Sequence, residues 1–256
     1  MSTRLSLFKT ATLFTLLGIL IATSTGIAQP LSKVAQSSLD IAYRLAGGNM
    51  TQWAATAFQD ASRAAPESVE ARLLGGMAWY VIGKEMQAIE LWREAEALGE
   101  EAASSLLGDV MFHQGDIAGA QAAYERALAT LPRAAKARFG LAMIAEKKDD
   151  LNGAIEHLEQ LIEPPSGDEA ELYVPMIDAY YHLGRLYLAD DRPAEAQKVL
   201  KVGTQLNSHH PGMHLMLAMA YEKNGLLAES VHLYERALQL DPNSQAAKEG
   251  LQRLHR

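Results

Sequence analysis

Three histidines stand close together near the C-terminal end of the sequence, at positions 209, 210 and 214. Imidazoles at a turn and about one helical turn further on could ligate a metal ion. No carboxylate in this stretch completes a ligand set, and a polar turn between two helices is the other interpretation. We therefore predict no metal and no cofactor, and a metal-binding protein that uses His209, His210 and His214 is an alternative hypothesis.

The other reactive side chains form no catalytic pattern. The chain has no cysteine, which excludes thiol catalysis, zinc–thiolate sites and disulfides. The sequence contains no nucleophile elbow, phosphate-binding loop or zinc-protease helix motif. The paired acids Asp149-Asp150 and Asp190-Asp191 are expected at turns between helices, where they can cap the helix that follows. We therefore expect a protein that is not an enzyme.

The composition favours a helical protein with a sizeable core. Of the 256 residues, 48% are hydrophobic. Alanine is abundant and runs of β-branched residues are scarce, which favours helix. The formal net charge is −8, and an acidic surface repels phosphate, so nucleic acid is not an expected partner.

Residues 1–28 have the pattern of an export signal. Arg4 and Lys9 precede an apolar run over residues 11–22, and small residues lead up to Ala28 as signal peptidases require. The run is short for a membrane span, which needs roughly 20 apolar residues. We expect cleavage near Ala28 and a periplasmic or secreted protein. The alternative is an uncleaved membrane anchor with the same domain facing the same side, so that only this segment would contact a membrane.

A pattern of helical pairs recurs after this segment, and the stretch that begins at Pro211 carries it most clearly. Small or aromatic residues, a turn glycine and a final proline follow at fixed offsets in that stretch: Ala218, Tyr221, Gly225, Ser230, Tyr234, Ala237 and Pro242. This pattern resembles the tetratricopeptide repeat, a unit of about 34 residues that forms two antiparallel helices. Gly83 and Gly115 stand where Gly225 does, at turns that need a left-handed backbone conformation.

The pattern holds its phase along most of the chain. After a short linker over residues 29–34, the solenoid is expected over residues 35–256. Its units are expected near residues 35–68, 69–100, 101–134, 135–168, 177–210 and 211–244, with an amphipathic cap over 244–256. The eighth and twentieth positions of every unit are small, because the two helices press together there. The 24th position is always large and fills the remaining space: Phe58, Trp92, Tyr124, Leu158, Leu200 and Tyr234.

The resemblance implies an all-α fold, a right-handed superhelical solenoid of about six helix-turn-helix units plus a C-terminal capping helix. No single unit can bury its own apolar face, so stability is expected to come from stacking. An insertion over residues 163–176 contains Pro164-Pro165-Ser166-Gly167-Asp168. It divides the array into four and two units, and we expect a surface loop there, with a hinge or an extra contact as the alternatives.

The resemblance also implies where a partner would bind. In the family, the first helices of the units line a concave groove, and the matching positions here are largely apolar. Methionine and aromatic side chains suit an adaptable surface for an apolar or amphipathic peptide. Some of these positions, the fifth above all, also pack between helices. The predicted contact residues are Tyr43, Leu73, Met77, Tyr80, Asp109, Phe112, Phe139, Met143, Tyr181, Arg185, Leu215 and Met219.

The kind of partner is limited by what the groove lacks. Some family members hold the terminal carboxylate of a peptide with a lysine–asparagine clamp, and the matching positions of the first two units contain neither residue. We therefore expect an adaptor or scaffold that binds a protein or peptide through apolar contacts, in a process such as envelope assembly or secretion.

Overall fold

The computed structural model describes residues 33–47, 50–164 and 176–254. These residues form thirteen helices and no strand, which confirms the expected all-α class. In this part of the chain, no helix combines the length and the apolar character that crossing a membrane requires. The predicted export signal, most of the linker and residues 165–175 of the predicted insertion lie outside the described residues.

The chain divides into two compact units between Pro132 and Arg133. The division therefore falls after the third helical pair, and the insertion lies within the second unit. The physical reason is that α9 and α10, on either side of the insertion, pack together. Their side chains, among them Leu158 and Leu183, share one core cluster.

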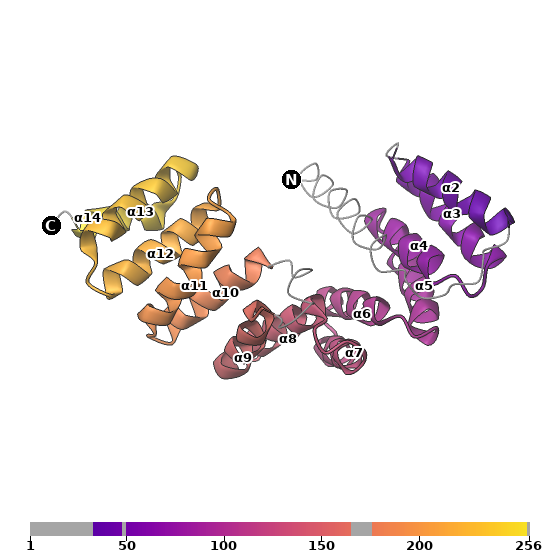
Figure 1. Cartoon of the computed structure of the whole chain (residues 1–256), viewed down its shortest axis with the longest axis horizontal. Helices are drawn as coiled ribbons and strands as arrows, with labels where there is room; N and C mark the ends of the chain where they lie inside the picture. The colour runs from indigo at the N-terminus through magenta and orange to yellow at the C-terminus, as the bar shows by residue number, and fades with distance from the viewer. Residues whose placement is uncertain (1–32, 48–49, 165–175, 255–256) are drawn as a thin grey trace. The chain divides into compact units, whose positions relative to one another are not determined.

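The described residues of the first unit form three helical pairs in sequence order (Figure 1). Each helix packs against the one that follows it. The bounds are α2 (Lys33–Gly47), α3 (Thr51–Ala64), α4 (Val69–Val81), α5 (Glu85–Ala97), α6 (Glu101–Gln114) and α7 (Ile117–Thr130).

Within the second unit, the described residues form three further pairs and a single last helix. Each helix again packs against the next, and α10 and α14 also contact α12. The bounds are α8 (Ala135–Lys147), α9 (Leu151–Ile162), α10 (Ile177–Ala189), α11 (Pro193–Leu206), α12 (Pro211–Lys223), α13 (Leu227–Leu240) and α14 (Gln245–Leu254).

In the pairs α4–α5, α6–α7 and α10–α11, a large side chain of the second helix lies over a glycine of the first. The six large residues at the 24th position are all buried, as predicted. Gly184 in α10 leaves the space that Leu200 of α11 occupies, because a Cβ atom at this glycine would overlap the leucine side chain. Gly76 makes the same space for Trp92, whose Nε1 donates to the carbonyl oxygen of Leu73 at 3.1 Å.

The turns between paired helices use a left-handed backbone residue. Gly115, at the end of α6, has φ of 84°, and Gly83 and Gly225 are similar, as predicted. Asp149 and Asp191 take this conformation in the turns after α8 and α10, with φ of 60° and 52°. Aspartate tolerates this region better than most residues because its short side chain bonds locally. The paired acids are thus explained by turns and helix caps.

The last helix covers the end of the second unit. Ala247 of α14 is buried, and Gly250 lies so close to the Tyr234 ring that a Cβ atom there would overlap it. Arg253 binds the Glu222 carboxylate through two hydrogen bonds of 3.1 and 3.0 Å. α14 therefore shields the apolar surface that α13 would otherwise expose.

Candidate functional site

The first helices of the first unit, α2, α4 and α6, carry six of the predicted contact residues. Tyr43, Tyr80 and Phe112 are half-buried. Leu73 and Met77 are only 1% and 6% exposed and belong to the core cluster of this unit. Both side chains therefore pack inside the core, as the fifth position was expected to do for Leu73, and their contact with a partner stays a prediction.

Tyr43 and Asp109, two polar members of the predicted set, form hydrogen bonds with other helices of the first unit. The Tyr43 hydroxyl donates to Glu70, and Asp109 accepts a hydrogen bond of 2.7 Å from the Tyr124 hydroxyl. Burial, followed by the neighbouring carboxylate, raises the pKa of both tyrosines far above the usual value. The hydroxyls therefore stay protonated and act as donors that join one helix to another.

The first helices of the second unit, α8, α10 and α12, carry the other six predicted residues, and we name their surface the α8–α10–α12 face. All six are half-buried. The partly buried side chains of Phe139, Met143 and Met219 pack against one core cluster. The face is defined by Phe139, Met143, Tyr181, Arg185, Leu215 and Met219.

A row of four rings connects the three helices of this face. The Phe139 ring meets the His182 ring edge-on, with the centroids 5.4 Å apart. His182 in turn meets Tyr181 edge-on at 5.6 Å. The Tyr181 ring lies 5.2 Å from that of His210, which precedes α12, at a tilt of 38°. Edge-on and offset contacts of this kind are favourable for aromatic rings.

An ion pair lies beside this row of rings. Arg185 of α10 binds Glu146 of α8, and the Nδ1 atom of His182 lies 4.0 Å from the same carboxylate. That Nδ1 atom is buried without a hydrogen bond. Burial, followed by the charge of Arg185, lowers the pKa of His182 below its usual value. The imidazole is therefore neutral at neutral pH, and the ring row has an apolar character.

Two of the three C-terminal histidines, His210 and His214, have separate structural roles. His210 caps α12, because its Nδ1 atom accepts from the backbone N–H of Met213 at 3.1 Å. The Nε2 atom of His214 pairs with the carbonyl oxygen of Ser208 at 3.0 Å. Among the described residues, no three histidine, aspartate or glutamate side chains converge on one point. The geometry thus favours the polar turn over the metal site.

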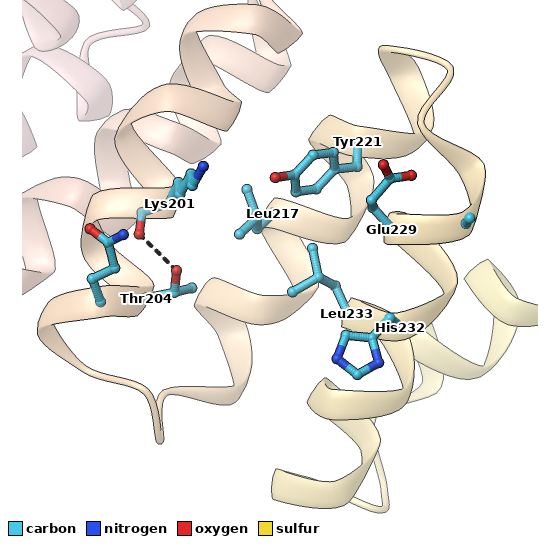
Figure 2. A pocket seen from close by; sticks show the side chains of 9 residues that line it. Lys201, Thr204, Leu217, Tyr221, Glu229, His232 and Leu233 are labelled. Carbon is cyan, nitrogen blue, oxygen red and sulfur yellow. Dashed lines mark hydrogen bonds between the residues drawn. The ribbon is translucent and has the colours of Figure 1, made fainter.

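A pocket of about 610 Å³ lies between α11 and α13, with α12 as its floor (Figure 2). None of the predicted contact residues lines it. In the sequence, its floor residues Leu217, Tyr221 and Leu233 follow the ordinary packing pattern of a helical pair. A space that the surrounding side chains leave open has no signal in the periodicity, so the pocket could not be predicted.

Comparison with protein families identifies the repeats. Two models, each described as a tetratricopeptide repeat, match residues 105–169 and residues 187–254. Together they span just over half of the chain. The chain belongs to the tetratricopeptide repeat family. The predicted resemblance is therefore confirmed over these two stretches, which contain the helices α7, α8 and α9 and the helices α11 to α14. No curated protein matches the chain.

Solved structures share the fold at low sequence identity. The structure of PilF from Pseudomonas aeruginosa is 13% identical with a TM-score of 0.69, over 85% of this chain and 96% of that chain. The tetratricopeptide-repeat protein YrrB is 16% identical with a TM-score of 0.59, over 77% and 99%. A chain of the Cut9–Hcn1 hetero-tetramer of the APC/C is 19% identical with a TM-score of 0.64. That alignment covers 96% of this chain but only 46% of the other, so this chain spans less than half of its length.

Proposed function

We propose that this protein is an exported, non-catalytic adaptor that binds an apolar or amphipathic segment of another protein on the first helices of its units. Its family membership makes it a protein-interaction scaffold, and scaffolds of this family are generally not enzymes. The location of the binding surface, the character of the partner and export are the proposed parts.

The observation that carries the proposal is the ring row of the α8–α10–α12 face. Phe139, His182 and Tyr181 present half-buried rings from two neighbouring helices. Met219 lies on the third helix of this face and adds a flexible, polarisable side chain. Rigid aromatic and adaptable methionine side chains are the residue types that bind apolar peptide segments with little loss of entropy. The ion pair between Glu146 and Arg185 supplies a polar edge beside them.

The structural neighbours support the proposal by analogy. YrrB is described as having an unusual peptide-binding site, and Cut9 is part of an assembly with a second protein, Hcn1. These properties belong to those proteins, and the likeness to this chain is one of fold. The same fold with half-buried aromatic side chains on its first helices supports peptide or protein binding here.

The proposal is tested by comparing two aromatic truncations in the full chain. A partner captured from native extract would be identified by mass spectrometry, purified and titrated by calorimetry. Tyr181→Ala removes the centre of the ring row, and we expect the affinity to fall about tenfold or more. Trp53→Ala is the control, because Trp53 is 69% exposed and lies on a second helix, α3.

The control should bind with unchanged affinity. If Tyr181→Ala has the circular-dichroism spectrum and melting temperature of the unchanged protein and still binds equally well, the α8–α10–α12 face is not the binding surface. If Trp53→Ala alone weakens binding, the surface lies on the second helices of the first unit.

Export rests on the sequence of residues 1–28, with its basic start and apolar run. The measurement is the mass of the N-terminal peptide of the protein isolated from its native cells. A chain that starts near Gln29 is expected for a cleaved signal and a periplasmic or secreted adaptor. A chain that retains residues 1–28 in the membrane fraction would instead support the anchored scaffold.

A further inference from the structure

We infer that the pocket between α11, α12 and α13 is a second peptide-docking site, which takes one large apolar side chain flanked by residues of opposite charge. This inference is independent of the α8–α10–α12 face, because no residue of that face lines the pocket. The pocket volume of about 610 Å³ lies within the range of roughly 300–1,000 Å³ that is usual for binding clefts.

The floor of the pocket is apolar and open. Leu217 of α12 is only 3% exposed and belongs to the core cluster of the unit. Tyr221 of α12 and Leu233 of α13 are half-buried and pack against that cluster. Ala228, at the rim, is too short to cover the floor. An apolar ligand side chain placed here would remove its own surface and that of the floor from water.

The two walls of the pocket carry opposite charges. Lys201 extends from α11 on one wall, and Glu229 extends from α13 on the other (Figure 2). Neither side chain has an ion-pair or hydrogen-bond partner among the described residues. On the α8–α10–α12 face, by contrast, Arg185 and Glu146 neutralise each other. A ligand with an acidic group towards Lys201 and a basic group towards Glu229 would therefore complement both walls.

The Tyr221 hydroxyl adds a polar group to the lysine side of the pocket. Figure 2 shows the Tyr221 ring at the floor of the pocket, with its hydroxyl directed towards the side of Lys201. This hydroxyl has no hydrogen-bond partner within the described part of the chain. The hydroxyl of Tyr234 on the next helix, by comparison, donates to Glu222 at 2.5 Å. The Tyr221 O–H is thus available to donate to the acidic group of a ligand, together with the Lys201 ammonium group.

A polypeptide is the ligand that matches these features. A single apolar side chain between an acidic and a basic residue is a common local sequence in proteins, and the array of repeats to which the pocket belongs is a protein-interaction scaffold. The exposed rim allows a peptide backbone to cross the pocket, because Gln205, Ala228 and His232 all lie in solvent.

The first test is an NMR titration of the isotope-labelled full chain with three capped tripeptides. Acetyl-Glu-Leu-Lys-amide is expected to cause saturable amide shifts confined to residues 201–205, 217–221 and 228–233. Acetyl-Gln-Leu-Gln-amide removes the charges and acetyl-Glu-Ala-Lys-amide removes the anchor, and each is expected to bind about fivefold more weakly. Equal affinity for all three peptides, no saturable shift, or shifts only at other residues would overturn the inference.

The second test is a change of specificity in a variant that should fold normally. Lys201 is exposed, so Lys201→Glu is expected to leave the melting temperature unchanged while both walls become acidic. The variant should then prefer acetyl-Lys-Leu-Lys-amide to acetyl-Glu-Leu-Lys-amide, whereas the unchanged protein shows the opposite preference. An unchanged preference would contradict the proposed role of Lys201.

One more variant distinguishes binding at the pocket from binding at the α8–α10–α12 face. Tyr181→Ala, which removes a ring of the α8–α10–α12 face, should bind the tripeptides as tightly as the unchanged protein. If N-acetyl-leucine amide binds as tightly as acetyl-Glu-Leu-Lys-amide, the pocket is an apolar cavity without preference for a charged peptide, and the inference fails even if the α8–α10–α12 face binds its partner.

Discussion

Tyr221 and Tyr234 lie on neighbouring helices and differ in what their hydroxyls contact. Tyr234 is fully buried and donates to Glu222, which Arg253 also binds. Tyr221 lines the open pocket. A hydrogen bond to a charged group is worth more than a neutral one, and a lost donor leaves its acceptor poorly satisfied.

We expect Tyr234→Phe to lower the free energy of unfolding by about 1 kcal/mol. Tyr221→Phe, which removes the same atom from a hydroxyl without a partner, should change it by less than about 0.3 kcal/mol. Urea unfolding followed by circular dichroism measures both variants. Equal effects would mean that the contact between Tyr234 and Glu222 contributes nothing to stability.

For Gly184→Ala, we expect a change in stability that is opposite in sign to the change that helix propensity alone would cause. In a helix interior, alanine is normally more favourable than glycine by roughly 0.5–1 kcal/mol. A Cβ atom at Gly184 would overlap the buried Leu200 side chain, so we expect Gly184→Ala to destabilise the protein by about 2 kcal/mol. The control is the double variant with Leu200→Ala, measured by urea unfolding. The double variant should lose less stability than the sum of the single effects, and strict additivity would refute the overlap.

These examples indicate which residues a sequence can assign. The small residues at the helix crossings and the large residues above them follow from the period, because two helices can approach closely only there. Leu73 and Met77 show that groove positions and packing positions can coincide. They occupy groove positions of the family and belong to the core cluster of the first unit, and a single sequence does not record how deeply each side chain is buried.

At the scale of an element, the helix α14 is held in place by apolar packing and by one ion pair. It is short, and its apolar side rests on Tyr234, while the pair formed by Arg253 and Glu222 fixes its end. Hydrogen bonds from Arg253 lower the pKa of Glu222 below the usual value for a glutamate. A carboxyl group whose pKa is lower in the folded than in the unfolded state stabilises the fold above the unfolded-state pKa. This contribution is lost as the pH falls through the lowered folded-state pKa.

We therefore expect Arg253→Met to reduce stability at pH 7 more than at an acidic pH below the lowered pKa of Glu222, where this carboxyl group is protonated in both proteins. Because Arg253 is exposed, the difference between the two pH values should be below about 1 kcal/mol. The control is Arg63→Met, which removes an exposed arginine that forms an ion pair with Asp60 inside the same helix, α3. Thermal unfolding at both pH values measures the effect. An equal loss at both would mean that the charge of Glu222 does not hold α14.

The helices and their turns were largely accessible from sequence. The turn glycines, the acids that replace them and the apolar period each reflect local backbone chemistry. The use of Asp149 and Asp191 in left-handed turns extends the glycine rule to residues that also tolerate this conformation. The pocket between α11 and α13 was not accessible, because it depends on the space left between three helices and not on the pattern of any one of them.

At the level of the whole chain, the two compact units each have a core of their own. The second unit buries Leu158, Leu183 and Leu217 in one cluster and closes its end with α14. A repeat array gains its stability from contacts between neighbouring helices, so a stretch with complete pairs and a cap can fold alone.

We predict that a fragment of residues 133–256 is helical by circular dichroism and unfolds in one cooperative transition. The control is a fragment of residues 151–256, which lacks α8 and leaves α9 without its paired helix. It should melt at a lower temperature, because Ala154 and Leu158 then lose apolar contacts. A fragment 133–256 without cooperative unfolding would contradict the independence of the second core.

The division into these units does not fall at the insertion, for which the sequence predicts a surface loop, a hinge or an extra contact. A run of prolines and glycine is a good signal of a loop, but a loop does not by itself separate two cores. Whether α9 and α10 pack together depends on their apolar side chains, and these continue the period on both sides of the insertion. Long-range packing therefore decided the position of the division, and a local break in the sequence did not.

The proposed role in protein binding is tested most directly by site-specific photo-crosslinking in native cells. A photoreactive amino acid would replace Tyr181 or Met219 on the α8–α10–α12 face, and Trp53 or Glu235 on second helices as controls. We predict that positions 181 and 219 form an adduct with one and the same partner, and that positions 53 and 235 do not. Adducts that form only at the control positions, or equally at all four, would contradict binding on the first helices.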